Sequence, residues 1–142
     1  MSLERWEKRF ITYPKGWNQP GTKGDLIATR ACLKKWKGLR KEVLARYGLC
    51  WQKGAMVGSS HEDEVSLWIA HHNCALCLRV WENLNQCTVD CPLARVRKGQ
   101  SCDDGKRSPY DSFCARGNPE PMIKLLEKAV VLLKQDLKKE KE

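Results

Sequence analysis

Four cysteines lie close together in the middle of this chain, at spacings that can hold a metal ion. They form two pairs, Cys74-x2-Cys77 and Cys87-x3-Cys91, within 18 residues. A Cys-x2-Cys turn places two thiolates where they can bind one ion, and a second pair completes the tetrahedral coordination of Zn²⁺ in structural sites. The pattern predicts a structural zinc ion bound by Cys74, Cys77, Cys87 and Cys91.

The spacing of the second pair leaves other ligand sets open, because it is Cys-x3-Cys and not Cys-x2-Cys. Cys102 lies eleven residues beyond Cys91 and can replace Cys87 or Cys91 as a ligand. Three further candidates lie in or beside this segment: His71, His72 and Cys114. Disulfides, an iron–sulfur cluster and inert buried thiols are the remaining interpretations, although the repeated Cys-x2-Cys-x2-Cys of bacterial ferredoxins is absent.

The compartment of the protein decides between metal binding and disulfides. The chain has 8 cysteines in 142 residues, and its first residues carry mixed charge without the apolar stretch of a secretory signal. Its longest aliphatic run, residues 129–133, is far shorter than the roughly 20 residues of a membrane-spanning helix. We therefore expect a cytoplasmic protein without a membrane segment, and in a reducing compartment clustered cysteines more often hold a metal.

A second pattern, made of basic residues, is typical of a surface that binds a polyanion. Residues 1–53 carry 13 Lys and Arg against 4 acidic residues, residues 54–91 carry 1 against 5, and residues 92–142 carry 12 against 8. The excess in the first third creates a local positive field that attracts nucleic acid or an acidic protein surface. A well-solvated, lysine-rich surface is the alternative explanation for this charge.

Part of this charge lies on a predicted amphipathic helix over residues 25–47, with Thr22 or Asp25 as N-cap and Gly48 as its end. Four basic residues follow one another along one flank at spacings of 4, 3 and 4: Arg30, Lys34, Lys37 and Lys41. At about 1.5 Å per residue they form a ridge on the order of 16 Å long, which can follow phosphates. Five more basic residues are predicted to contact phosphates: Arg95, Arg97, Lys98, Lys106 and Arg107.

The other segments are predicted from turn residues and hydrophobic periodicity. Residues 1–24 contain four aromatic residues and two turns with Pro and Gly, which predict an extended arm packed against the domain. Residues 48–64, rich in Gly and Ser, predict a loop, and the alternation of residues 65–70 predicts a short strand. Residues 118–142 predict an amphipathic helix with Asn118 as a cap and proline in its first turn.

Several short motifs occur in order along residues 31–133: Leu33-x2-Trp36, Cys74-Ala75-Leu76-Cys77, Cys91-Pro92-Leu93, Cys102, Ser108-Pro109-Tyr110 and Met122. With these motifs the chain resembles small cysteine-rich proteins encoded by phages and bacteria, for which no activity is assigned. The resemblance implies a cytoplasmic metal-binding protein of phage or prophage origin. The Cys-x3-Cys spacing departs from this pattern, so the resemblance does not fix the ligand set.

Three patterns in the sequence contain catalytic residue types, but none predicts an enzyme. Residues 61–63 read His-Glu-Asp, but the H-x-E and P-C-x-x-C motifs of zinc deaminases are absent. Residues 71–73 read His-His-Asn as in some nucleases, but adjacent histidines on a strand point to opposite faces. Asp103 and Asp104 could bind Mg²⁺ with Asp111 only if the fold joined them.

Together these patterns predict one mainly α domain over residues 1–142. A zinc-stabilised cysteine knuckle with little β structure, within residues 65–117, is expected between the N-terminal basic helix and the C-terminal amphipathic helix. The predicted function is non-catalytic binding of nucleic acid, or regulatory binding, through the basic surface. The alternative is a phage-type factor that binds and modulates or inhibits a host enzyme. A metal-dependent nuclease is the third hypothesis, and it requires an open coordination position on the metal.

Overall fold

The computed structural model describes residues 2–52, 55–58, 64–65, 75–82, 91–100, 102 and 108–141. The described part is mainly helical with three short strands, which confirms the predicted fold class of a mainly α protein with little β structure. In chain order the elements are α1 (Ser2–Phe10), α2 (Thr22–Gly38), α3 (Lys41–Arg46), β1 (Leu49–Gln52), β2 (Ala55–Gly58), β3 (Glu64–Val65), α4 (Ala75–Glu82), α6 (Pro92–Val96), α7 (Pro109–Arg116) and α8 (Glu120–Glu140).

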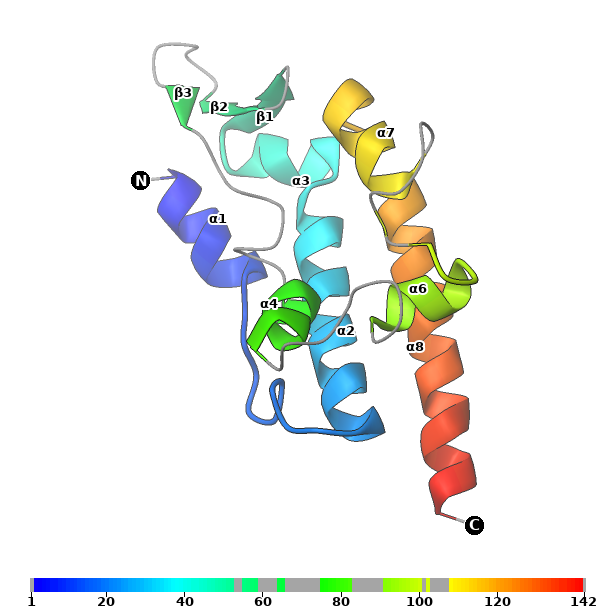
Figure 1. Cartoon of the computed structure of the whole chain (residues 1–142). Coiled ribbons are helices and arrows are strands. Elements are labelled where there is room, and N and C mark those ends of the chain that lie inside the picture. The colour runs from blue at the N-terminus through cyan, green and yellow to red at the C-terminus, as the bar shows by residue number, and fades with distance from the viewer. Residues whose placement is uncertain are drawn as a thin grey trace.

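The two longest helices of the described residues, α2 and α8, lie side by side, with α2 in the middle of the molecule and α8 along one side (Figure 1). Trp36 of α2 and Phe113 of α7 meet edge to face with ring centres 5.0 Å apart, and Leu126 of α8 is fully buried in the same cluster. In the described ranges α2 and α8 bury their apolar stripes against each other. Of the segment predicted to lie between these two helices, α4 contacts α2, whereas α6 and α7 contact α8. The placement of the whole cysteine segment stays a prediction.

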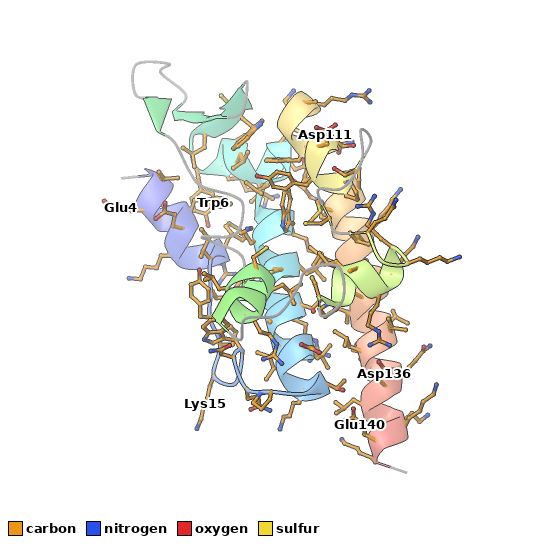
Figure 2. The ribbon with its side chains drawn as sticks, in the orientation of Figure 1. Glu4, Trp6, Lys15, Asp111, Asp136 and Glu140 are labelled. Atoms are coloured by element: carbon orange, nitrogen blue, oxygen red, sulfur yellow. The ribbon has the colours of Figure 1, made fainter. Side chains whose placement is uncertain are left out.

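The N-terminal segment differs from the predicted extended arm, because residues 2–10 form helix α1. Trp6 and Phe10 are four residues apart, so a helix places both rings on one side, where their centres are 5.6 Å apart. The Trp6 side chain is completely buried and points from α1 toward α2 (Figure 2), where its Nε1 donates a hydrogen bond to the carbonyl of Gly38 at 2.8 Å. The predicted packing of this segment against the core is therefore correct, although its conformation was not.

The predicted helix over residues 25–47 is interrupted after Gly38. Arg40 has an extended backbone, with φ −61° and ψ 140°, and α3 begins at the next residue. Helix α2 begins at Thr22. After α3, Gly48 has a φ of 68°, the left-handed conformation that commonly ends a helix and that glycine adopts without steric cost. Because the chain is extended at Arg40, the four predicted ridge residues do not lie on one continuous helix.

Residues 48–64 also differ from the prediction, since they contain strands and not only a loop. β1 and β2 are antiparallel, with Leu49 paired to Gly58 and Gln52 to Ala55, and β3 adds to the other edge of β2. The two strands contain one aromatic and one β-branched residue, Trp51 and Val57, which are residue types that favour strands. The Gly and Ser residues of this segment favoured a loop and concealed these two. Of the predicted strand over residues 65–70, only Val65 is among the described residues.

The C-terminal helix α8 lies within the predicted range of residues 118–142. Its buried face contains Met122, Leu125, Leu126, Ala129 and Leu133, as the periodicity indicated. The side-chain oxygen of Asn118 accepts a hydrogen bond from the backbone N–H of Glu120 at 3.1 Å, which satisfies one donor at the helix start. None of the helices in the described ranges combines the length and the apolar character that crossing a membrane requires.

Candidate functional site

A cleft of about 530 Å³ opens where α1, the end of α2 and α3 meet. We call it the basic cleft, because among the described residues that line it five of eight are cationic and none is acidic: Arg5, Arg9, Lys37, Arg40 and Arg46. The other three lining residues are Phe10, Val43 and Tyr47. The cations come from positions spread over 42 residues of sequence, so it is the fold that brings them together.

Two of these cations are held by neighbouring groups. Arg40 donates through Nε and Nη2 to the two carboxylate oxygens of Glu120, at 2.7 and 3.3 Å. This hydrogen-bonded pair lowers the pKa of Glu120 below its ordinary value and raises the pKa of Arg40. The guanidinium of Arg5 lies 5.8 Å from the centre of the Tyr47 ring, within the range of a cation–π interaction.

The other three cations of the basic cleft have no such counterpart. The side chains of Arg9, Lys37 and Arg46 are exposed and form no hydrogen bond or ion pair with any residue of the described ranges. Each stands in the last turn of its helix, α1, α2 and α3 respectively. Helix C-termini carry partial negative charge from unsatisfied carbonyls, which helps to offset the repulsion between the three side chains.

The walls of the basic cleft are fixed by packing between aromatic rings and α2. The ring of Phe10 meets that of Tyr47 edge to face, with centres 5.8 Å apart. Phe10 also lies directly on Gly38, where a Cβ atom would come within 2.4 Å of the ring. Glycine at this position therefore lets α1 approach α2 closely enough for Arg5 and Arg9 to face Lys37.

The structure places the four predicted ridge residues, Arg30, Lys34, Lys37 and Lys41, on the surface, but on two helices. Lys37 lines the basic cleft, whereas the other three do not. Lys35, which lies between two of them in sequence, has the opposite environment: it is 2% exposed, with its ammonium 5.5 Å from the centre of the Trp36 ring. The role of these four ridge residues in contacting phosphates remains a prediction.

The second predicted basic group lies on and after α6. Arg95 pairs with Asp136 of α8 at 2.7 Å, so part of its charge is already compensated (Asp136 is labelled in Figure 2). Arg97 donates to the side chain of Gln100 at 3.4 Å, and Lys98 is exposed in a left-handed backbone conformation. Lys106 and Arg107 lie outside the described residues.

The predicted metal ligands are only partly within the described residues. Cys77 is on α4 and Cys91 directly precedes α6, and both pack against the main hydrophobic core, as does the alternative ligand Cys102. The other two predicted ligands, Cys74 and Cys87, lie outside the described ranges, as do His71 and His72. Cys114 is on α7, but its side chain is not described.

Within the described ranges, no three Cys, His, Asp or Glu side chains are grouped so that they could hold a metal ion. Only two of the four predicted zinc ligands, Cys77 and Cys91, are within the described ranges, so the four-cysteine zinc site stays a prediction. Of the residues with catalytic side-chain types, Asp111 is exposed in the first turn of α7, and residues 61–63, 71–73 and 103–104 lie outside the described ranges.

Comparisons with protein-family models, with curated proteins and with solved structures found no match for this chain.

Four of the five cations in the basic cleft were missed by sequence reasoning: Arg5, Arg9, Arg40 and Arg46. A signal for two of them was present, because Arg5 and Arg9 are four residues apart and share one face if the segment is helical. Because this segment was predicted to be extended, the two arginines were not placed on one face. The approach of α1 to α2 has no local signature, since it depends on Trp6 reaching Gly38 across 32 residues of sequence.

Proposed function

We propose that this chain is a non-catalytic nucleic-acid-binding protein whose basic cleft holds backbone phosphates. The observation that carries the proposal is the convergence of five cationic side chains on one cleft, with no carboxylate among the lining residues that the structure describes. Phosphates are the dominant contact in nucleic-acid binding, and each neutralised phosphate releases counterions. Three of the five cations, Arg9, Lys37 and Arg46, make no ion pair within the described ranges and are available to a bound phosphate.

An ordinary solvated surface explains this arrangement less well. Solubility requires only that charges of both signs be interspersed, and like charges brought close together weaken the folded state. Here the packing of Trp6 and Phe10 on Gly38 keeps the cations of α1 beside those of α2 and α3. A bound polyanion would relieve that repulsion, so binding is expected to stabilise the fold as well.

A structural zinc ion is the second part of the proposal, with Cys74, Cys77, Cys87 and Cys91 as ligands. The cysteine pattern supports it, and so does the position of Cys77 and Cys91, which both pack against the core that α2 and α8 form. Four thiolate ligands would leave zinc no open position for chemistry, in keeping with a structural role. The zinc would link the segment that contains α4 to the one that contains α6.

The test is the affinity of the purified protein for fluorescently labelled 12-nucleotide DNA and RNA at low salt. A triple variant, Arg9→Gln, Lys37→Gln and Arg46→Gln, should bind at least about tenfold more weakly, because several phosphate contacts are lost. The matched control replaces three exposed lysines at the far end of α8 by glutamine: Lys134, Lys138 and Lys139. The control removes the same net charge and should bind almost as tightly as the wild type.

Two results would overturn the proposal. Equal losses in the two triple variants would mean that net charge, and not the basic cleft, causes binding. Tighter binding of an acidic peptide than of either nucleic acid would favour the alternative function, an interaction factor that docks on an acidic protein surface. An acidic peptide of the same charge as the oligonucleotide is therefore included in every titration.

A further inference from the structure

The size of the basic cleft limits what can enter it. A volume of about 530 Å³ lies within the range of roughly 300–1,000 Å³ that is typical of small-ligand pockets. A DNA duplex is much wider, since its major groove alone measures about 12 Å across. A duplex can therefore touch only the rim of the cleft, whereas one nucleotide of a flexible single strand can enter it.

The lining of the basic cleft combines charge with aromatic surface. Phe10 and Tyr47 contribute their rings, and the planar guanidinium of Arg5 lies over the ring of Tyr47. Proteins that bind single strands pair a positively charged groove with aromatic side chains on which bases stack. A duplex offers no unstacked base to such a surface. The rings of Phe10 and Tyr47, which we call the aromatic wall, would therefore contribute nothing to duplex binding.

Packing orients the two rings of this wall. The ring of Phe10 meets that of Tyr47 edge to face and also lies against Gly38. Arg40 is oriented in the same way by its two hydrogen bonds to Glu120. Groups that are already ordered lose little entropy on binding, which favours affinity for a small unit such as one nucleotide.

We propose that the basic cleft binds one nucleotide of a single-stranded nucleic acid, with the phosphate among Arg9, Lys37 and Arg46 and the base against Tyr47 and Phe10. This inference rests on the proposed function and makes it more specific, since it names the strand state and the unit that is recognised. Recognition is through the phosphate and the flat face of the base, so it depends little on sequence.

The test compares three ligands of equal length with the wild-type protein: a single-stranded 12-mer, the same sequence as a duplex, and a 12-mer of abasic sugar-phosphate backbone. The intact single strand should bind at least about tenfold more tightly than the duplex. The intact single strand should also bind at least about fivefold more tightly than the abasic strand, because the abasic strand has no bases to stack on the aromatic wall. This comparison needs no variant and is independent of folding defects.

Variants then locate the effect. Tyr47→Leu should weaken binding of the intact strand but leave affinity for the abasic strand unchanged, and Tyr47→Phe should retain both affinities because the ring remains. The matched control is Tyr13→Leu, which removes a tyrosine that is 41% exposed and does not line the cleft. Circular dichroism of each variant establishes that the helical fold is kept.

The possible failures are distinguishable. Equal affinity for single strand and duplex, or for intact and abasic strands, would overturn this inference while the cleft cations could still bind phosphate. A Tyr47→Leu variant that folds and binds the intact strand like the wild type would overturn it as well. Loss of the proposed function has a different signature, which is weak binding of all three ligands by the wild-type protein.

Discussion

The guanidinium of Arg79 on α4 lies 2.8 Å from the carboxylate of Asp25 at the start of α2. Its remaining nitrogens donate to backbone carbonyls of the loop between α1 and α2: those of Trp17 at 3.3 Å and Gly21 at 3.1 Å, and that of Gln19. The Arg79 side chain is only 8% exposed. One buried arginine thus joins the cysteine-containing segment to the loop that leads from the basic cleft into α2.

Replacing Arg79 with methionine should lower the free energy of unfolding by about 2–4 kcal/mol, because Asp25 and three backbone carbonyls lose the donor of a largely buried guanidinium. Methionine keeps much of the side-chain volume, so the loss reports hydrogen bonding more than packing. Urea denaturation measures the change, with Arg116→Met on the exposed end of α7 as the control. A loss in Arg79→Met no larger than in the control would mean that the hydrogen bonds of Arg79 contribute nothing net to stability.

The close contact between α1 and α2 at Gly38 gives a second prediction. Gly38→Ala should destabilise the protein by about 1–3 kcal/mol, since the added methyl group overlaps the Phe10 ring. The variant should also bind single-stranded nucleic acid more weakly, because α1 carries Arg5 and Arg9 away from the cleft. In a double-mutant cycle with Phe10→Ala the two changes should not be additive, as expected for groups in contact. Additive effects would contradict the contact.

Zinc content tests the cysteine assignment. The purified protein should contain about one zinc ion per chain, and Cys77→Ser or Cys74→Ser should lose the metal together with cooperative unfolding, because three ligands hold zinc less tightly. Cys50→Ser, outside the cysteine segment, is the matched control and should keep its zinc. Elemental analysis that finds no zinc in the wild type, or that finds iron with sulfide absorption, would refute the assignment.

The pair between Arg40 and Glu120 predicts a dependence of stability on pH. The folded state lowers the pKa of Glu120 below 4.5, so the pair stabilises the fold at higher pH and this contribution is lost as pH falls through the lowered pKa. The contribution should be less than about 1 kcal/mol, because both side chains are partly exposed and screened by solvent.

The measurement is the difference in free energy of unfolding between the wild type and Glu120→Gln, whose side chain does not titrate. This difference should be constant from neutral pH down to about pH 5.5 and should shrink below pH 4.5. A difference that grows as the pH falls has the wrong sign for a carboxylate with a lowered pKa.

The sequence predicted those features that depend on local periodicity. The buried face of α8, with Leu126 and Ala129, follows directly from residues recurring every three to four positions. The end of the helical region at Gly48 could also be predicted, since glycine readily adopts the left-handed backbone that is found there. These features need no knowledge of the rest of the chain.

What could not be predicted depends on contacts between distant residues. The helix of residues 2–10 is stabilised by Trp6 reaching Gly38, and no pattern within that segment reveals its partner. The interruption at Arg40 is accompanied by pairing with Glu120, which is 80 residues away in sequence. Because both contacts build the basic cleft, periodicity alone could find Lys37 but not the site to which it belongs.

The salt dependence of binding tests the central claim most directly. For a single strand, each phosphate contact contributes about 0.7 to the slope of log affinity against log salt concentration. The triple variant at Arg9, Lys37 and Arg46 should therefore show a slope shallower than that of the wild type by up to about 2, whereas the control at Lys134, Lys138 and Lys139 should keep the wild-type slope. A slope unchanged in the cleft variant, or reduced equally in both, would contradict phosphate binding in the basic cleft.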